Sequence, residues 1–439
     1  MAARYRRSLI VLAALGAAAC GGVAPSSGTA EPTESGPSAA TRSTDFTPSP
    51  SGIALLASDT PRDRSPDVAD ADLTELVAGN TDFAAALYRT LDDGSENLLL
   101  GPHSASVGLA MVLAGAEGAT ASQLATALQL DLADERLHGA FNQLDLELAT
   151  RNNDDLTLAI ANRAFGQTGY EFLDGYVELL ARDYSSPFGT LDFASDPELA
   201  RQAINKWVAA QTRERIEELF PAGTIDPNTQ LALVDAVYLD ASWHFPFNAE
   251  LTESEPFHRL DGAAVSVPTM HFNEYLPSGF GAGWSAVEIP YTGGELSMVV
   301  IVPEDLRTFE SRLDGELLRE VFGSLTDGGI HLALPRFSFG YHASLVQPLR
   351  DLGVAAAFDD ANFSGMTGTR ALALAAVEHA TFIRVNEEGT EAAAATGSAM
   401  RDSHGPTVTV DRPFVFAIRD RVTGTVLFLG RVTDPGAAA

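Results

Sequence analysis

The sequence predicts one large domain of the α+β class, and three observations predict it. The chain has 439 residues, of which 45% are hydrophobic and 20% are charged, as is typical of a globular protein. Its apolar pattern runs from Val68 to Asp434 without a second linker. Helical patterns come early in this stretch and strand patterns come late, without strict alternation, which indicates largely antiparallel or mixed sheets.

The early stretches have apolar residues at helical spacing. In the first of them, Leu73, Leu76 and Val77 begin a pattern that continues to Leu91. The expected helices cover residues 72–91, 104–113, 119–128 and 200–219. The later runs are short and apolar, and their length and composition favour strands. The expected strands cover residues 231–239, 297–302, 329–334, 376–385, 408–418 and 425–432.

The N-terminus has the pattern of an export signal. Three arginines precede an apolar run over residues 9–19, which ends in three alanines before Cys20. About eleven apolar residues are too few to span a bilayer, so we expect residues 1–19 to be a signal peptide. Small residues followed by a cysteine resemble a bacterial lipobox, which implies acylation of Cys20 and a lipoprotein at the cell surface or in the periplasm. The alternative is ordinary signal cleavage and secretion.

Residues 20–65 are predicted to be a disordered tether. This segment is rich in Ser, Thr, Pro, Gly and Ala and has no apolar period, so it cannot bury enough surface to offset the entropy of ordering. We therefore place the folded domain at residues 66–435. Cys20 is the only cysteine, so no disulfide is expected within this domain.

The charge of the chain argues against nucleic acid as a partner. There are 59 acidic and 28 basic residues, and the net charge is −31, so the surface repels phosphates. We also find no Gly-x-Ser-x-Gly motif, no histidine pair with metal-ligand spacing and no phosphate-binding loop. We expect a monomer that is not an enzyme and that uses no cofactor or metal.

The segment after Val385 does not have the length or composition of a simple turn. About twenty residues separate two expected strands, whereas a short hairpin needs two to five. If the segment became a strand, small residues would share one face, and Gly389 at its start would supply a backbone hinge. The residues on that face are Thr390, Ala392, Ala394, Thr396 and Ser398. From spacing alone, a short alanine-rich helix with an acidic start is equally favoured.

This segment is similar to the hinge signature of the serpin family. It reads Val377-x-His379-x-x-Phe382-Ile383-x-Val385-Asn386-Glu387-Glu388-Gly389-Thr390-Glu391-Ala392. Further blocks in the expected order extend the resemblance over nearly the whole domain. They include Asn80-x-x-Phe83, Pro102-x-Ser104, Ala161-Asn162, Ile204-Asn205-x-Trp207, Trp243, Pro290-Tyr291, Asp411-Arg412-Pro413-Phe414 and Gly430-Arg431-Val432. Together with the leader, the chain resembles an exported bacterial serpin of the lipoprotein type.

The resemblance implies an α+β fold with three β-sheets, eight or nine helices and an exposed reactive-centre loop. In serpins, a target protease cleaves this loop and becomes acylated through its own nucleophile. The cut loop then inserts as a new central strand of the largest sheet, and the protease is distorted. We therefore expect a suicide inhibitor of serine or cysteine proteases with a metastable fold. The alternative is a non-inhibitory serpin that acts as a substrate-like binder or chaperone.

The resemblance also assigns roles to residues. The hinge comprises Glu387, Glu388, Gly389, Thr390, Glu391, Ala392, Ala393, Ala394, Ala395 and Thr396. The region where the sheet opens contains Ser104, Asp235, His379 and Arg336, and Arg336 is expected to pair with Glu387. Gly101 and Asp235 depart from the serine and asparagine that are usual in the family. Because a buried carboxylate needs a partner, we hypothesise that Asp235 pairs with His379.

The scissile bond is expected between Met400 and His404. Counting onward from Glu387 places Ser403 before the bond, whereas counting back from Pro413 places Asp402 there. Arg401 would suit a trypsin-like pocket with a carboxylate, and Met400 would suit a chymotrypsin-like or elastase-like pocket. The alternatives remain open, so the target protease does not follow from the sequence.

Overall fold

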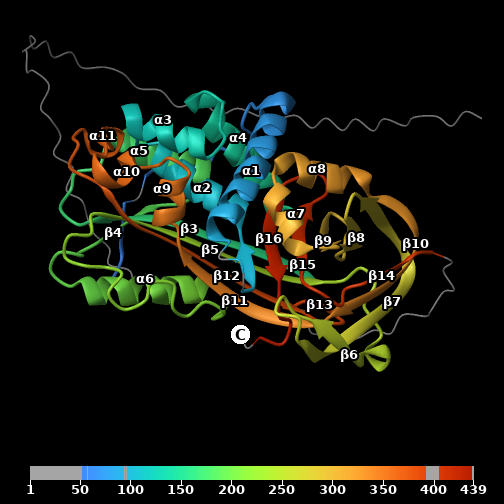
Figure 1. Cartoon of the computed structure of the whole chain (residues 1–439). Helices are drawn as coiled ribbons and strands as arrows, with labels where there is room; N and C mark the ends of the chain where they lie inside the picture. Colours follow the sequence, from blue (N-terminus) through green and yellow to red (C-terminus); the bar gives the residue numbers. More distant parts are fainter. Residues whose placement is uncertain (1–51, 57, 93, 95, 392–404, 438–439) are drawn as a thin grey trace, which may run out of the picture. The chain divides into compact units, whose positions relative to one another are not determined.

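The computed structural model describes residues 52–437, except residues 57, 93, 95 and 392–404 (Figure 1). Several predicted sites lie outside the described residues. They are the signal peptide, Cys20, the hinge residues Ala392, Ala393, Ala394, Ala395 and Thr396, and the scissile candidates Met400, Arg401, Asp402, Ser403 and His404.

One sheet has seven strands in the order β1-β4-β3-β5-β13-β12-β11. Its strands are β1 (Ala54–Leu56), β4 (Phe188–Leu191), β3 (Leu156–Gln167), β5 (Leu231–Ser242), β13 (Gly389–Thr390), β12 (Leu374–Val385) and β11 (Phe337–Ser344). The central strands β5 and β12 are buried along most of their length, which their continuous apolar sequences predict.

A second sheet has nine strands. They are β14 (Thr407–Thr409), β10 (Thr326–Pro335), β7 (Ala264–Gly281), β8 (Trp284–Pro290), β9 (Leu296–Pro303), β15 (Phe414–Asp420), β16 (Val426–Val432), β2 (Leu98–Leu100) and, beside β7, β6 (Glu253–His258). The 18-residue strand β7 pairs with β6 and β10 over most of its length and with β8 at its C-terminal end. This one strand joins two groups of strands, so the described residues form two sheets where three were expected.

The described residues also form eleven α-helices, where eight or nine were expected. Most are α1 (Asp70–Leu91), α2 (Pro102–Leu113), α3 (Gly118–Ala127), α4 (Asp134–Ala149), α5 (Asp174–Leu179), α6 (Pro197–Gln211), α7 (Leu306–Arg312), α8 (Gly315–Ser324) and α9 (Val346–Asp351). The count rises because α10 (Ala356–Asp359) and α11 (Ser364–Thr367) are single turns of four residues. A π-helical turn (Leu180–Tyr184) follows α5, and a 3-10 turn (Ala249–Leu251) precedes β6.

The seven-stranded sheet is covered on both faces. Figure 1 shows α2, α3 and α5 on one side of it and α6 on the other. The larger core contains residues of α1 to α5 and of both sheets. The smaller core lies under α6, where the sheet contributes small side chains such as Ala161, Ala236, Ala376 and Ala380. Small residues on this face allow α6 to approach the strands closely.

Three predicted boundaries are wrong. The helix expected over 200–219 ends at Gln211, because Arg213 and Glu214 adopt the left-handed conformation, which residues with a Cβ disfavour. The strand expected over 408–418 is two strands, β14 and β15, with Pro413 in the break between them. The segment expected to be a tether up to residue 65 includes ordered residues, because β1 pairs with β4 and Ile53 is buried.

Candidate functional site

The segment after β12 turns back and enters the seven-stranded sheet. Its two-residue strand β13 is antiparallel to both neighbours, with Gly389 opposite Ser242, Thr390 opposite Ala241, and Thr390 opposite Val385. Beyond this point β5 and β12 pair directly and in parallel, from Leu231 and Leu374 to Tyr238 and Phe382. The start of the predicted loop is therefore already placed between the two strands at one end of their shared ladder.

The turn between β12 and β13 is held by hydrogen bonds. The Asn386 side chain accepts the backbone N–H groups of Glu388 (2.9 Å) and Gly389 (3.1 Å). The Trp243 indole N–H donates to the Asn386 carbonyl (2.9 Å), and the Trp243 backbone N–H donates to the Glu388 carbonyl (2.8 Å). The Phe247 N–H donates to the Glu387 carbonyl (2.8 Å). The turn is thus fixed to the segment that follows β5.

Gly389 is required by close packing. A Cβ at this position would lie 2.1 Å from the Ala241 carbonyl oxygen and 2.8 Å from the Ser242 Cα. Its φ is not in the left-handed region. The sequence led us to expect a flexible hinge at Gly389, whereas in this structure the glycine allows β13 to fit against β5.

Thr390 faces inward. It is buried, and its hydroxyl lies 2.6 Å from the Tyr291 hydroxyl. The Tyr291 ring stacks on Trp243, with ring centroids 4.6 Å apart. The first small residue of the predicted inward face therefore does point into the core.

Glu391 is the last described residue before the loop. Its φ is +63°, and its side chain is only 3% exposed and forms ion pairs with Arg215 (2.7 Å) and Arg384 (3.6 Å). Burial raises the pKa of Glu391 and outweighs the opposing effect of the two arginines. Sequence reasoning placed Glu391 in the hinge but gave it no partner.

The predicted pair of Glu387 and Arg336 is confirmed. The Arg336 Nε donates to Glu387 Oε1 at 2.8 Å, and a second guanidinium N–H and the Thr252 hydroxyl donate to the same oxygen. Burial favours the neutral acid, but these hydrogen bonds outweigh it and hold the pKa of Glu387 below its usual value. The pair links the turn after β12 to the residue just before β11.

The other residues predicted for sheet opening meet under the strand pair β5–β12. Asp235 and His379 are opposite each other, and His379 Nδ1 lies 2.7 Å from Asp235 Oδ2. The Ser104 hydroxyl donates to the other oxygen of Asp235. The Gly101 N–H donates to His379 Nε2 (3.1 Å), so Nε2 is the acceptor and Nδ1 carries the proton. The hypothesis that Asp235 pairs with His379 is confirmed.

This cluster does not have the arrangement of a Ser-His-Asp triad. Its carboxylate lies between the hydroxyl and the imidazole, whereas in the triad the imidazole lies between the other two groups. Close packing explains why residue 101 is glycine, since a Cβ there would lie 2.3 Å from Val237 Cγ1. A serine in this position would require Val237 to move.

In the part of the chain that the structure describes, no group of three or more His, Cys, Asp or Glu side chains could hold a metal ion. No helix there is long and apolar enough to cross a membrane.

Sequence reasoning missed several residues that hold the hinge. They are Thr252, Arg215, Arg384 and the stacked pair of Trp243 and Tyr291. One signal was available: Glu391 is the only charged residue between Gly389 and Met400. A lone charge in a run of small residues indicates a specific partner, but the sequence does not identify the partner because Arg215 is distant along the chain.

Comparison with known proteins relates this geometry to one family. The family model described as "Serpin (serine protease inhibitor)" matches residues 78–435. The chain is 37% identical over 381 residues to leukocyte elastase inhibitor A of Mus musculus, and the match covers 83% of this chain and 100% of that protein.

Solved structures show the same relation. The native-state structure of the thermophilic serpin Tengpin superimposes with a TM-score of 0.78 at 27% identity and covers 84% of this chain and 96% of that one. Uncleaved ovalbumin superimposes with a TM-score of 0.75 at 25% identity and covers 82% of this chain and 100% of that one.

Proposed function

Since the chain belongs to the serpin family, we propose that it inhibits serine or cysteine endopeptidases covalently, by inserting its cleaved loop into the seven-stranded sheet. One observation carries the proposal: Gly389 and Thr390 already form a strand between β5 and β12. The loop therefore has a starting register, antiparallel to both neighbours. The chain itself supplies no catalytic group in this reaction, because the nucleophile belongs to the protease.

The register of β13 indicates which contacts insertion must break. If the same pairing continues along the sheet, Ala392 comes to lie between Leu239 and Ile383. Thr396 then comes to lie between Asp235 and His379, the two residues whose side chains now bond directly. Insertion would therefore separate Asp235 from His379 and replace the parallel ladder of β5 and β12 with two antiparallel ladders.

The side chains of the loop suit this step. Thr390 points into the core, and Ala392, Ala394 and Thr396 follow it at the strand period. Small inward side chains can enter a packed core without overpacking it. Each residue that joins the sheet gains ladder hydrogen bonds worth ~0.5–1.5 kcal/mol each, which favours insertion after cleavage.

The test uses residues 21–439 and a panel of trypsin, chymotrypsin, elastase and subtilisin. Elastase is included because the mouse relative is named as an inhibitor of leukocyte elastase. We expect a covalent complex that survives denaturing gels and a released C-terminal peptide whose first residue identifies the scissile bond by mass spectrometry. Cleavage by every protease, without a complex or loss of protease activity, would instead support the non-inhibitory role of a binder or chaperone.

We further propose that the chain is an exported bacterial serpin, tethered to a membrane through acylated Cys20. The support is the leader sequence, in which basic residues, a short apolar run and small residues precede the cysteine. The test expresses the full chain in a bacterial host with labelled palmitate. Label in a membrane-bound protein, lost in Cys20→Ser, is expected; release of unlabelled protein cut after Ala19 would support ordinary secretion.

A further inference from the structure

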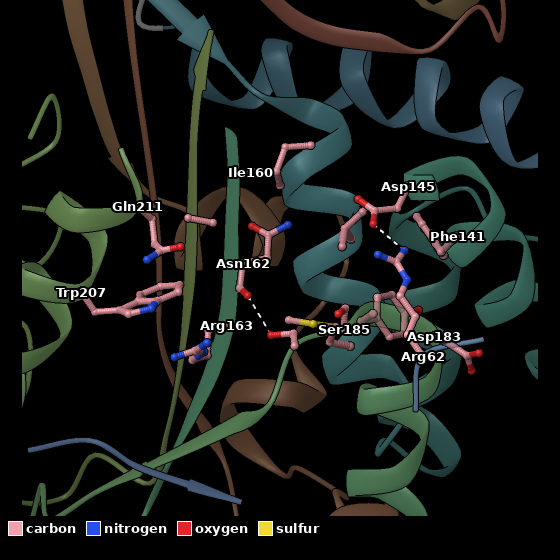
Figure 2. A pocket seen from close by; sticks show the side chains of 15 residues that line it. Arg62, Phe141, Asp145, Ile160, Asn162, Arg163, Asp183, Ser185, Trp207 and Gln211 are labelled. Carbon is pink, nitrogen blue, oxygen red and sulfur yellow. Dashed lines mark hydrogen bonds and ion pairs between the residues drawn. The ribbon is translucent and has the colours of Figure 1, made fainter. Parts of the chain in front are cut away.

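A second site lies away from the hinge, at the outer edge of the seven-stranded sheet. It is a cavity of about 250 Å³ beside β3, between α6 on one side and α2, α4 and the turn after α5 on the other (Figure 2). Strand β4 pairs with β3 only at residues 165–167. The part of β3 that lines the cavity therefore has a strand neighbour on one side, β5, and an open edge on the other.

Arg163 on β3 is the notable charge in this cavity. Its guanidinium is half-buried and lies over the Trp207 ring, 4.3 Å from the ring centroid, and Figure 2 shows the two side chains together at one wall. Its Nε is buried and has no hydrogen-bond partner among the described residues. Burial lowers the pKa of Arg163 to about 10, so the side chain is still a cation at neutral pH.

The other charges around the cavity are already neutralised. Arg62 pairs with Asp145 at 2.5 Å, as the dashed line in Figure 2 shows, and also donates to the Asn142 side chain (2.9 Å). Asp183 pairs with Arg182 at 2.7 Å. Among the described residues that line the cavity, Arg163 is thus the charge without an ionic partner. This is unusual in a chain with a net charge of −31.

The remaining walls are mixed. Their apolar part includes Val107, Met111, Phe141, Ile160 and Tyr184, and their polar part includes Asn162, Ser185, Ser186 and Gln211. An arginine stacked on an aromatic ring keeps the edge of its planar fork available for a bidentate carboxylate. Aromatic and aliphatic side chains beside a few polar groups and one oriented charge can hold a small molecule that carries an anion.

We propose that this cavity binds a small organic anion, in which a carboxylate pairs with Arg163 on the α6 side and a flat body lies along the open edge of β3 toward the walls formed by α2 and α4. At ~30 Å³ for each water molecule, the cavity has room for roughly eight waters, which suits a compound of one or two rings. The site does not involve the hinge or the protease, so its test does not depend on whether the chain is an inhibitor.

The test compares 2-naphthoate with its neutral amide, 2-naphthamide, by isothermal titration calorimetry on residues 21–439. The two compounds share their shape and differ in charge. We expect 2-naphthoate to bind at least tenfold more tightly, because hydrogen bonds to charged groups are the stronger ones. Arg163→Gln should weaken 2-naphthoate binding by about tenfold to a hundredfold and leave 2-naphthamide unchanged.

Arg312→Gln is the matched control, since Arg312 is an exposed arginine at the end of α7. It should bind 2-naphthoate as the parent protein does. Thermal unfolding checks that each variant is folded, and Arg163→Lys, which retains charge but not the fork, should bind with intermediate affinity. Equal affinity for the two compounds, or an unchanged affinity in Arg163→Gln, would overturn the proposal.

Discussion

At the scale of single residues, buried polar contacts hold the central strands together. Asp235 is 1% exposed and His379 is fully buried, and each is bonded to the other. The carboxylate has a second donor in Ser104, and the imidazole has a second partner in the Gly101 N–H. A buried charge is tolerated only with such partners. The cluster therefore links β5 and β12 with the start of α2, at the place where the proposed insertion would separate the two strands.

The first prediction concerns Asp235. Asp235→Ala leaves the buried His379 Nδ1–H without an acceptor, whereas the Ser104 hydroxyl can still donate to Asn162 Oδ1 (3.0 Å), and it should lower the free energy of unfolding by about 1–3 kcal/mol. Asp235→Asn keeps one acceptor oxygen and should cost about 1 kcal/mol or less. Urea unfolding measures both, and both variants should also insert the loop faster. Equal stability of Asp235→Ala and the parent protein would show that the cluster does not stabilise the closed sheet.

The second prediction concerns pH and Glu387. Because the folded protein holds the pKa of Glu387 below its unfolded value near 4.3, the stabilisation is complete above that value. It is lost as the pH falls through the lower, folded pKa. Glu387→Gln should therefore cost about 1 kcal/mol at pH 7, a value discounted because Arg336 is 42% exposed.

The control for this prediction is Glu388→Gln, which changes the neighbouring carboxylate. Urea midpoints measured from pH 7 to pH 3 should show the Glu387→Gln deficit shrinking below about pH 4, with little change for Glu388→Gln. A deficit that grows in acid would contradict the sign of the shift.

At the scale of elements, β13 is the unusual feature. A strand of two residues has few ladder bonds of its own, so its position depends on the turn before it and on the side chains around it. The turn is bound to Trp243 and Phe247, Gly389 fits against Ala241, and Thr390 reaches Tyr291. Glu391 then ends the docked segment with two ion pairs.

The third prediction tests the fit of Gly389. In Gly389→Ala the new Cβ meets the backbone of Ala241, which cannot move without disturbing β5, so β13 should leave the sheet. Hydrogen exchange of peptides covering residues 386–391 should become faster. Gly340→Ala on β11 is the matched control, because its Cβ would lie 3.8 Å from the nearest atom. Unchanged exchange in Gly389→Ala would show that the close contact does not govern docking.

The fourth prediction tests the inward face of the loop. Thr390→Arg places a charge where the structure buries a hydroxyl against Tyr291, so insertion should slow while the scissile bond stays available. Loop insertion competes with hydrolysis of the acyl-enzyme, and each ~1.4 kcal/mol added to the insertion barrier changes the ratio of the two rates tenfold. The amount of inhibitor consumed per protease inactivated should therefore rise about tenfold or more. Thr390→Val, which keeps the shape, should still inhibit. A covalent complex formed equally well by Thr390→Arg would exclude insertion in this register.

The sequence predicts some of these elements and not others, for physical reasons. Strong apolar periods locate α1, α2, α3, β5, β9, β12 and β16, because burial imposes those periods. The sequence did not predict the end of α6. A left-handed residue at the end of a helix is usually glycine or asparagine, whereas here the left-handed residues are Arg213 and Glu214. The Asp235–His379 pair could be inferred because Asp235 stands where the family usually has asparagine, and a buried carboxylate needs a partner. The ion pair of Glu391 with Arg215 could not be inferred, because the two residues are distant in the sequence and only the fold brings them together.

At the scale of the whole molecule, the proposed insertion would give the seven-stranded sheet more strand pairing than it has now. The parallel ladder of β5 and β12 occupies most of the length along which β13 would continue. Antiparallel pairing is slightly more stable per residue than parallel pairing, and an inserted strand adds a ladder on each side. The uncut loop is attached at both ends, to β13 and to β14, so the connection to β14 limits how far it can enter.

The fifth prediction concerns cleavage, which frees one end of the loop. Cleavage between residues 400 and 404 should let the loop enter and add about ten ladder bonds at ~1 kcal/mol each. The midpoint of thermal unfolding should then rise by roughly 10–20 °C above that of the intact protein. Differential scanning calorimetry of intact and nicked protein measures the change. Nicked Thr390→Arg should gain much less, because its inward charge stops insertion near the start. A nicked parent protein that unfolds at or below the midpoint of the intact form would mean that the loop does not join the sheet, and β13 would then serve only to anchor the loop.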